Sequence, residues 1–413
     1  MNLLRKAITT EFSHFKSLPV HAQKLIVSYS LYKIAYPFLA IFINAFLYRQ
    51  TGRFSTIALY SIGTFIGLPL GFYINGILLK KFTANKLFLM SSVAQGISII
   101  PLIFLQKTTT PFVFFFGLLF GVFFGLWWSN RHYFSLNSIP DENRNYFEGV
   151  SSSISTLINI IIPALIGWFI VAGSYSQSYT PEQAYKILII IATIILFFAG
   201  YHIRSVKIAR DPIQLLLKNV TDRWKKVRAM GFFTGLKSGV FFYAPALVVL
   251  SLIGDEGALG FVLSLSAVLA ALITYSIGRK STTHHRLLIT ILGFIILTSG
   301  SVILNINFAL WGALIFMILD TIADSMEQLA FLPIMYQSIE KDNTDNKGHN
   351  YARICDLEVF LNAGRVMGAL LFIYIASLTS QMISLKVNLL IAAIFQLISI
   401  VFLYKLLNHP EKK

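Results

Sequence analysis

The chain has 413 residues, of which 56% are hydrophobic and only 13% are charged. Soluble domains carry about 25% charged residues, so this composition excludes a water-soluble globular protein and indicates that lipid is part of its solvent. The 34 Lys and Arg residues against 18 Asp and Glu give a formal charge of +16, which suits either nucleic acid or an anionic membrane surface. The distribution of these charges favours the membrane, and we expect no nucleic-acid partner.

Cysteine usage and the first residues narrow the class further. Cys355 is the single cysteine, so the sequence has no disulfide framework and no multi-cysteine metal or iron–sulfur site. The first 20 residues contain Arg5, Lys6 and Lys16 but no long apolar run and no small-residue cleavage site. We therefore expect no removable signal peptide and an amino terminus that stays in the cytosol.

Twelve apolar runs are long enough to cross about 30 Å of hydrocarbon as helices, which takes roughly 20 residues each. They are continuous and about twice as long as the alternating strands of a closed barrel. The sequence therefore predicts an all-α membrane protein with 12 transmembrane helices. The predicted spans cover residues 22–48, 55–79, 85–106, 111–136, 147–172, 184–203, 230–253, 258–278, 287–306, 308–337, 354–378 and 384–407.

The Lys and Arg residues outside these spans indicate how the chain is oriented. With a cytosolic amino terminus, the inner segments hold 26 of them and the outer loops hold five. Because basic residues accumulate on the cytosolic side, this ratio predicts a multi-pass protein of the plasma (inner) membrane with both termini in the cytosol. The five outer residues are Arg49, Arg53, Lys107, Lys186 and Lys386.

Eight of the cytosolic basic residues fall in residues 204–228, with six predicted spans on either side. Asp211 and Pro212 are typical of a helix start, and apolar residues follow them at helical spacing. This pattern predicts an amphipathic helix that lies on the inner leaflet; a solvated linker is the alternative. The apolar positions are Ile213, Leu216, Leu217, Val220, Trp224 and Val227.

The two halves resemble each other at a nearly constant offset, which is the internal repeat expected of many transporters. Lys33 in the first span and Lys237 in the seventh are 204 positions apart, and a proline follows each. An Asn-Tyr pair precedes both the fifth and the eleventh span, 205 positions apart. We therefore predict two pseudo-symmetric six-helix bundles over residues 1–203 and 230–413, joined by a basic cytosolic linker with the amphipathic helix over 204–229.

This architecture resembles the major facilitator superfamily, in its six plus six helices, long basic central loop, cytosolic ends and short basic loops after spans 2 and 8. The resemblance implies a secondary transporter. The family's loop signature has a glycine followed four positions later by an acidic residue, whereas this chain has Gly76 followed by Lys80, and Thr83 replaces a glycine. The antiporter signature of span 5 is reduced to Pro163 and Gly167, which gives no support for drug antiport.

A cytosolic latch of reversed polarity is predicted in place of the missing acidic one. Acidic residues begin spans 11 and 5, where the helix dipole favours them, and basic residues end spans 2 and 8 on the same side of the membrane. We expect two pseudo-symmetric ion pairs that close the inner mouth in one state; ordinary interfacial charges in water are the alternative. The predicted gate residues are Lys80 and Lys81 with Asp356 and Glu358, and Glu148 with Arg279 or Lys280.

Span 10 carries the sharpest signal in the chain. Asp320, Asp324 and Glu327 are spaced i, i+4 and i+7, so they share one face of a helix. With an outer start near Phe308 and 1.5 Å per residue, Asp320 lies about 18 Å deep, near the midplane. Because a charged group at this depth costs about 2.5–3.5 kcal/mol on insertion scales, we predict that the three acids are functional and form a proton ladder.

Span 11 brings Arg365 to a similar depth, about 16 Å from the start of the helix, which predicts that Arg365 pairs with Asp320. Burial raises the pKa of a carboxyl group and a neighbouring cation lowers it. A carboxylate that exchanges partners during a conformational change would therefore load and release a proton. A static buried charge network that only specifies helix packing is the alternative.

Cations inside the spans predict a cavity of positive potential, and hence an anionic or zwitterionic small-molecule substrate. Lys33 lies near the middle of span 1, and Lys237 lies in the inner third of span 7. Arg131, at the inner end of span 4, suits the role of a positive-inside membrane anchor as well as it suits that of a substrate contact. The expected substrate-binding residues are Lys33, Lys237, Arg365, Tyr32, Tyr36, Trp128, Asn362 and Arg131.

The sequence has no Walker loop, dinucleotide fingerprint, metal-binding His pair or nucleophile elbow, so we expect no enzyme, no cofactor and no metal site. The predicted function is secondary active transport, by symport or antiport, coupled to protons and carried out by alternating access in a monomer within the lipid bilayer. Two alternatives stay open, a lipid or amphiphile flippase and a membrane receptor or scaffold that does not transport.

Overall fold

Helices make up nearly all of the described chain. The computed structural model describes residues 15–105, 108–138, 141–206, 214–217, 220–331, 333–335 and 349–407. Of residues 135–138, 141–145, 283, 349 and 350 it describes only the backbone. No strand occurs in these ranges, and the all-α prediction is confirmed.

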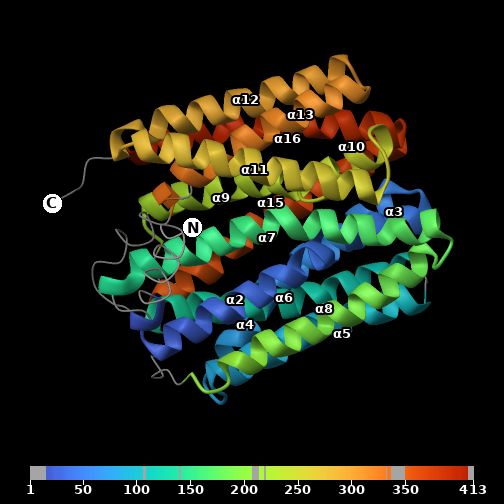
Figure 1. Ribbon diagram of the computed structural model, residues 1–413. Helices are drawn as coiled ribbons and strands as arrows, with labels where there is room; N and C mark the ends of the chain where they lie inside the picture. The colour runs from blue at the N-terminus through green and yellow to red at the C-terminus, as the bar shows by residue number, and fades with distance from the viewer. Residues whose placement is uncertain are drawn as a thin grey trace, which may run out of the picture.

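The first six predicted spans are helices in the lower part of Figure 1, coloured blue to light green. The first span is interrupted, because α2 (Val20–Pro37) leads into a π-helical segment, η1 (Phe38–Phe42), and then into α3 (Ile43–Thr51). The next five spans are α4 (Phe54–Leu78), α5 (Ala84–Leu105), α6 (Thr110–Ser138), α7 (Asp141–Ser176) and α8 (Pro181–Ile203).

The other six spans lie mainly in the upper part of Figure 1. The seventh is broken into α9 (Asp222–Phe241) and α10 (Ala244–Leu252), and the tenth is α13 (Leu310–Met326) continued by a second π-helical segment, η3 (Glu327–Phe331). The remaining helices are α11 (Glu256–Lys280), the short 3-10 turn η2 (Thr283–His285), α12 (Arg286–Ile306), α15 (His349–Leu378) and α16 (Gln381–Leu407).

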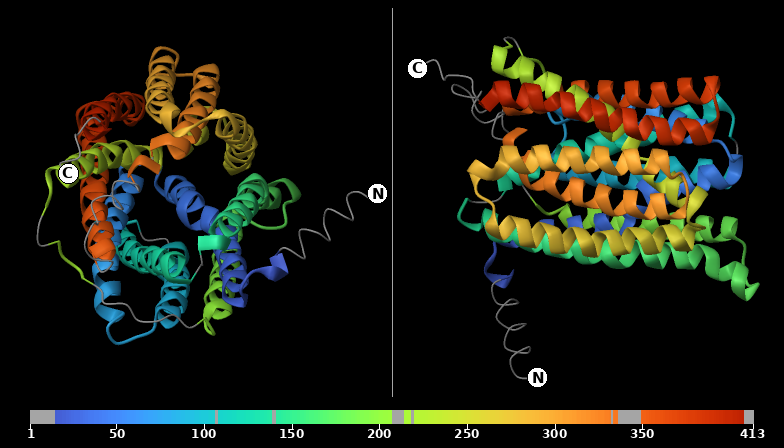
Figure 2. Two further views of the ribbon diagram at one scale, coloured as in Figure 1. Left: turned by 90° about the vertical axis from the view of Figure 1, so that its left-hand side faces the viewer. Right: turned by 90° about the horizontal axis from the view of Figure 1, so that it is seen from above.

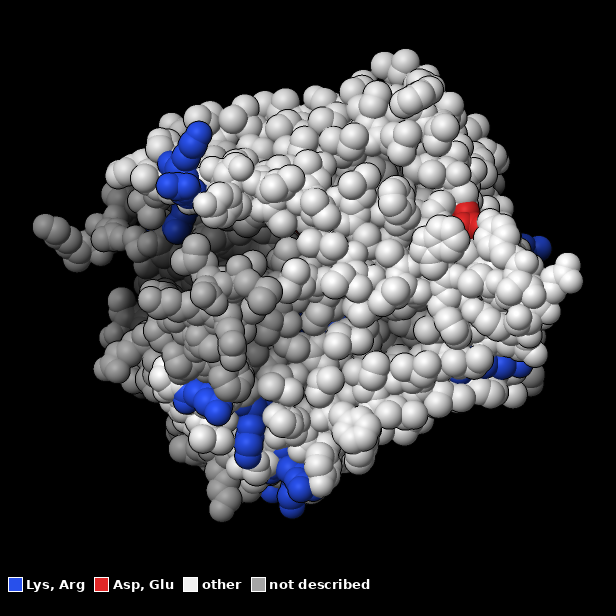
Figure 3. Space-filling view, in the orientation of Figure 1, with Lys and Arg blue, Asp and Glu red and all other residues white. Residues whose placement is uncertain are grey.

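Eleven of these spans, within the described ranges, are long and apolar enough to cross a membrane. The predicted tenth span is α13 with η3, in which the regular helix ends at Met326. Figure 3 shows Lys and Arg gathered mainly towards the end at which the chain termini lie in Figure 1. The broad band beyond this end is almost free of charged side chains on that face, as expected of a surface in contact with lipid.

Glycines let two pairs of helices approach backbone to backbone. A Cβ atom on Gly67 of α4 would collide with the Leu118 carbonyl of α6, and one on Gly121 of α6 would collide with the Thr64 carbonyl of α4. Gly364 of α15 meets the Phe232 carbonyl of α9 in the same way. These small-residue seams, recognisable in the sequence, hold the helices together where lipid offers no hydrophobic driving force.

The two halves meet along two helix pairs. α15 packs against α4, and α11 packs against α7, the latter pair lying side by side in both views of Figure 2. Gly260 of α11 faces the Pro163 carbonyl of α7, and Gly167 of α7 faces the Glu256 carbonyl of α11. Pro163 and Gly167, which remain of the span 5 signature, therefore lie at a close contact between the halves.

Helix breaks occur in the two spans that carry Lys33 and Lys237, in addition to the π-helical segment η3 of the tenth span. Pro37 ends α2 one turn after Lys33, and the π-helical segment η1 follows. Pro245 lies in the first turn of α10, two turns after Lys237. Proline removes a backbone donor and crowds the preceding turn, and π-helical segments are frequent at functional sites, so these breaks point to the region around the two lysines.

The predicted amphipathic linker helix is wrong where the structure describes it. Residues 214–217 are not helical, and α9 begins at Asp222 with Thr221 as its N-cap, whose hydroxyl accepts a hydrogen bond from the backbone N–H of Trp224 at 3.1 Å. Trp224 and Val227 are fully buried against residues such as Leu403 of α16. The apolar spacing thus belongs to the start of span 7, which packs on protein; residues 207–213 lie outside the described ranges.

Candidate functional site

The three acids of span 10 gather around one lysine. Lys237 Nζ of α9 donates a hydrogen bond to Glu327 Oε2 of η3 at 3.0 Å, and both residues are buried, with 6% and 8% of their surface exposed. The charges of Asp320 and Asp324 also act on this ammonium group. The i, i+4, i+7 spacing therefore produces a real cluster, and the break at Glu327 lies within it.

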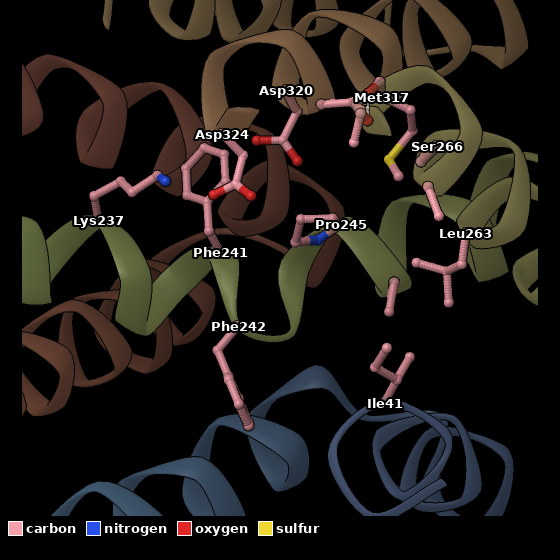
Figure 4. A pocket seen from close by; sticks show the side chains of 14 residues that line it. Ile41, Lys237, Phe241, Phe242, Pro245, Leu263, Ser266, Met317, Asp320 and Asp324 are labelled. Atoms are coloured by element: carbon pink, nitrogen blue, oxygen red, sulfur yellow. Dashed lines mark hydrogen bonds between the residues drawn. The ribbon is translucent and has the colours of Figure 1, made fainter. Parts of the chain in front are cut away.

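A cavity of about 360 Å³ opens beside this cluster. Its lining comes from α9, α10, α11 and α13, with Ile41 of η1 from the other half. Figure 4 shows the Lys237 nitrogen and the carboxylates of Asp320 and Asp324 pointing towards one another, while Phe242 points away towards the N-terminal helices. Asp324 is also exposed, so the cavity is accessible from outside the protein.

The charge of this cavity differs from the predicted positive one. Three carboxylates face a single ammonium group, and Lys237 is already held by Glu327. Lys237 therefore belongs to the acidic cluster and is not a free cation for an anionic substrate. The described span runs over Asp222–Leu252, so Lys237 lies near its middle and not in the predicted inner third. The sequence also did not reveal which neighbouring helix Lys237 faces.

The predicted pairing of Arg365 with Asp320 is wrong in this structure. Arg365 of α15 donates from Nε to Ser238 Oγ at 3.2 Å and from Nη1 to Asn362 Oδ1 at 3.0 Å. Ser238 and Lys237 are adjacent on α9, so their side chains point about 100° apart around the helix. Arg365 and the acids of span 10 thus lie on different sides of α9, although their depths in the membrane are similar.

A second polar stripe runs along α15. Glu358, Asn362 and Arg365 are spaced i, i+4 and i+7, and Asn362 Nδ2 donates to Glu358 Oε2 at 3.0 Å. The charge of Arg365 reaches both Glu358 and the Tyr36 hydroxyl of α2, which belongs to the other half. Glu358 therefore lies in the interior beside Arg365 and not at the predicted cytosolic gate.

Two cations of the N-terminal half, Lys33 and Arg131, lie close enough for their charges to interact. Lys33 Nζ lies 5.5 Å from the centre of the Tyr36 ring, and the charge of Arg131 acts on Lys33. The Arg131 guanidinium lies 4.8 Å from the Trp128 ring, and its Nε is buried with no hydrogen-bond partner in the part of the chain that is described. No carboxylate lies within ion-pair distance of Lys33 or Arg131 among the described residues.

The predicted aromatic contacts divide into two groups. Tyr32 is 1% exposed, its hydroxyl donates to Gln95 Oε1 at 2.8 Å and its ring is stacked on Trp127, so the structure commits it to the core of the N-terminal half. Tyr36 and Trp128 are only partly buried and adjoin Lys33 and Arg131. Tyr32 is therefore removed from the set of candidate substrate contacts, and the other two stay.

The first predicted cytosolic ion pair is not made in this conformation. Asp356 instead accepts hydrogen bonds from Arg228 Nε and from Trp224 Nε1 of α9, both at 2.7 Å. A guanidinium fork binds a carboxylate in a bidentate manner, whereas Lys80 and Lys81 are exposed on flexible stems that gain little from an ion pair in water. Asp356 therefore fastens α15 to α9 within the C-terminal half.

The second predicted pair, Glu148 with Arg279 or Lys280, is also not made. All three side chains are exposed, and no ion pair joins them in the described part of the chain. At the same end of the molecule the halves are joined by a neutral contact, in which Tyr351 Oη of α15 donates to the Phe72 carbonyl of α4 at 2.7 Å. The sequence singled out Tyr351 only as a marker of the internal repeat.

Several residues of the site escaped the sequence analysis. Phe241, Phe242, Met317 and Thr321 line the cavity, but apolar residues in an apolar span carry no signal that separates a cavity wall from a lipid contact. No group of three or more His, Cys, Asp or Glu side chains in the described ranges is arranged to hold a metal ion.

Comparisons with known proteins agree with this architecture. The sequence profile of the Major Facilitator Superfamily matches residues 25–349. The chain is 21% identical to the uncharacterized protein YqgE of Bacillus subtilis (strain 168) over 371 residues, which cover 88% of this chain and 84% of that protein. It is also 23% identical to an uncharacterized protein in the sodM 3′ region of Geobacillus stearothermophilus over 139 residues, which cover 34% of this chain and 65% of that protein.

Three solved structures share the fold. A bacterial homologue of the iron transporter ferroportin in an inward-facing state has a TM-score of 0.71 at 12% identity, covering 94% of this chain and 99% of that one. A bacterial metal transporter has a TM-score of 0.60 at 11% identity, covering 95% and 100%. The fucose:proton symporter FucP of E. coli has a TM-score of 0.59 at 11% identity, covering 92% and 98%.

Proposed function

This chain belongs to the major facilitator superfamily, and within that family of membrane transporters we propose that it is a proton-coupled secondary transporter of a small organic anion or zwitterion that works by alternating access. The observation that carries the proposal is the cluster of Asp320, Asp324 and Glu327 around Lys237 beside an open cavity. We further propose that it acts as a monomer in the plasma membrane, with both termini in the cytosol.

Coupling to protons follows from the charge imbalance of this cluster. When all four groups are ionised, three negative charges face one positive charge, and like charges that share a site repel one another. A proton bound by one of the acids reduces this repulsion. Because Asp324 is exposed and Asp320 lines the same cavity, we infer that protons enter from the cavity and that Glu327 keeps Lys237 in place.

The substrate class is supported by the other group of charges. Lys33 and Arg131 lack carboxylate partners in the described ranges, and Arg365 approaches Tyr36 from the opposite half. A buried guanidinium nitrogen without an acceptor favours an anionic ligand, since burial of an unpaired donor is costly. Glu358 beside Arg365 offers a counter-charge for an amine, which favours a zwitterion over a simple anion.

Alternating access is supported by the helix breaks. The first, seventh and tenth spans are interrupted at η1, at Phe242–Tyr243 and at η3, and each contributes to the cavity or to the charges around it. Discontinuous helices at the binding site are a recurring feature of secondary transporters. We infer that these breaks let the halves change their relative orientation while the site stays intact.

The test uses purified protein in proteoliposomes with a pH-sensitive dye inside. A thermal-stabilisation screen of carboxylates and amino acids supplies the ligand, and its addition is expected to drive proton movement. In Asp320→Asn the ligand should still bind while proton movement is lost; Asp222→Asn, an exposed acid paired with Lys225 on the surface, is the matched control. Ligand movement that ignores an imposed pH gradient and is unchanged in Asp320→Asn contradicts the coupling.

The proposed contact of Lys33 with the substrate is tested by comparing two lysine variants on α2. Lys33→Met should weaken binding of the ligand found in the screen by at least tenfold, because it removes an interior cation that has no carboxylate partner among the described residues. Lys24→Met, in which the lost ammonium is exposed and bonded to Ser205, should leave binding unchanged. Equal binding by the two variants removes Lys33 from the substrate site.

A second candidate, transport of a lipid or amphiphile, is favoured by one observation. A groove of about 320 Å³ between α2, α7 and α8 is lined only by apolar side chains, among them Phe38, Leu165 and Ile191. Leu165 and Ile191 are exposed on the outer surface of the bundle, so the groove opens towards lipid. Movement of a fluorescent phospholipid between leaflets in the same proteoliposomes would favour this candidate over the first.

A further inference from the structure

An ion pair between a partly exposed guanidinium and a buried carboxylate joins the two halves at the side of the molecule that the charge count assigns to the outside. Arg49, in the last turn of α3, donates from Nε to Glu256 Oε1 at 2.7 Å and from Nη2 to Glu256 Oε2 at 2.5 Å. Glu256 is the first residue of α11 and belongs to the opposite half. Tyr185 of α8 adds a hydrogen bond from its hydroxyl to Glu256 Oε1 at 3.2 Å.

Glu256 is sealed from water in this conformation. Its side chain is 3% exposed, whereas that of Arg49 is 34% exposed. The close approach of α7 and α11 explains the seal, since Gly167 and Gly260 bring the two backbones together directly beside Glu256. The halves therefore cannot separate along this edge without breaking the bonds of Arg49 and Tyr185 to Glu256.

Two further contacts lie along the same interface. The backbone N–H of Phe54, at the start of α4, donates to Gln381 Oε1 at the start of α16, at 2.5 Å. The backbone N–H of Ala164 of α7 donates to Ser264 Oγ of α11 at 3.1 Å. These are single hydrogen bonds, so the bidentate, charged contact of Glu256 is the strongest polar link on this side within the described ranges.

The positions of Arg49 and Glu256 at helix ends lower the cost of separating the two charges. Glu256 lies at the amino end of α11 and Arg49 at the carboxyl end of α3, where the helix dipoles favour a negative and a positive charge respectively. If the halves separated here, each charge would be left at a helix end that stabilises it, in water that entered the gap. A charge stranded in the interior, which makes a broken buried pair costly, would not result.

We propose that Arg49, Glu256 and Tyr185 form the outer gate of the transporter, closed in this conformation and opened when the site faces outwards. This inference rests on the proposed alternating-access function, and it places the charged gate on the opposite side from the one that the sequence suggested. The cytosolic contact through Tyr351 is a neutral hydrogen bond, so the halves are joined by a neutral contact on the inner side and by a charged one on the outer side.

The test measures access to the interface and does not depend on transport. Ser264→Cys is introduced into α11, where Ser264 is 9% exposed between the halves, in a background that carries Cys355→Ser. Right-side-out vesicles are treated with a membrane-impermeant maleimide. Glu256→Gln should raise the rate of labelling at least fivefold over the unmodified gate, and the swapped pair Arg49→Glu with Glu256→Arg should lower it again.

Asp255→Asn is the matched control. It removes an exposed acid one residue away that caps α11 through the backbone N–H of Ala258 at 3.1 Å, and Asn is an equally good cap, so labelling should not change. If Glu256→Gln does not yield folded protein, Tyr185→Phe removes only one hydrogen bond and should give a smaller rise. The proposed gate is overturned if Glu256→Gln is labelled at the same rate as the control Asp255→Asn. If Tyr185→Phe has to be used in place of Glu256→Gln, the same comparison with Asp255→Asn applies.

The result separates the gate from the function on which it rests. Labelling that responds to Glu256→Gln in a protein that moves no ligand supports a moving outer gate and contradicts the proposed transport. Labelling that does not respond, in a protein that couples ligand to protons, leaves the transporter in place and removes these three residues as its gate.

Discussion

Lys237 and Glu327 illustrate how a charge is kept inside a membrane protein. Each is buried, and their hydrogen bond of 3.0 Å crosses from α9 to η3. Removing an ion from water costs several kcal/mol, which a well-placed partner offsets. Lys33, the counterpart of Lys237 in the internal repeat, has no such carboxylate partner in the described ranges, so the two lysines serve different purposes in a duplicated framework.

This difference predicts a specific pattern of stability. Lys237→Met should destabilise the protein by about 3–5 kcal/mol, because it leaves the Glu327 charge buried without its partner. Adding Glu327→Leu to Lys237→Met should restore part of this loss. Both variants leave Asp320 and Asp324 without the ammonium group, so the difference between them reports on Glu327 alone.

The measurement is thermal denaturation in detergent, followed by the fluorescence of a thiol-reactive dye on Cys355, which is fully buried in the folded protein. A double variant that is no more stable than Lys237→Met would show that the bond between these two residues does not hold the helices together. The Asp222→Asn variant, altered at the exposed start of α9, should melt like the unmodified chain.

At the level of helices, periodicity in the sequence predicts which residues share a helix face, but it does not predict which neighbouring helix that face packs against. The stripe Asp320, Asp324 and Glu327 was predictable, because residues at i, i+4 and i+7 must share a helix face. The partner of Arg365 was not predictable. The sequence indicates only how deep Arg365 lies in the membrane, whereas the direction in which it points is set by the side-chain packing of α15 against α9. The π-helical segment η3 was equally hidden, since residues 327–331 show no proline or glycine.

The glycine seams give a prediction at this level. Gly67→Ala on α4 should destabilise the protein by about 1–3 kcal/mol, as overpacking does in well-packed interiors, because its Cβ would collide with the Leu118 carbonyl of α6. Gly149→Ala on α7 is the matched control: it meets nothing within 4 Å, and Ala is favoured over Gly in a helix by about 0.5–1 kcal/mol. In the same assay the melting temperature should therefore fall for Gly67→Ala and rise for Gly149→Ala. An unchanged melting temperature for Gly67→Ala would show that α4 and α6 can move apart to accept the added methyl group.

For the whole molecule, the sequence predicted the fold and eleven of the twelve spans, namely those that the described residues show as long and apolar enough to cross a membrane, because length and apolarity decide both. It failed where contacts between the halves decide the outcome. Acidic helix starts at Asp356 and basic helix ends at Lys80 and Arg279 suggested cytosolic ion pairs, yet Asp356 binds Arg228 within its own half. A charged link between the halves, among the described residues, joins Glu256 to Arg49, which the sequence indicates only as a basic residue of an outer loop.

Orientation in the membrane decides whether that link is an outer gate, and it is measurable directly. Cysteines replace Lys81, exposed after α4, and Arg53, exposed before it; each is introduced alone, and the buried Cys355 contributes little background. Because basic residues accumulate on the cytosolic side, Arg53→Cys should react with an impermeant maleimide in intact right-side-out vesicles, whereas Lys81→Cys should react only after the membrane is permeabilised. The reverse pattern would place Arg49 and Glu256 at the cytosolic mouth, and their pair would then close the inner side of the transporter.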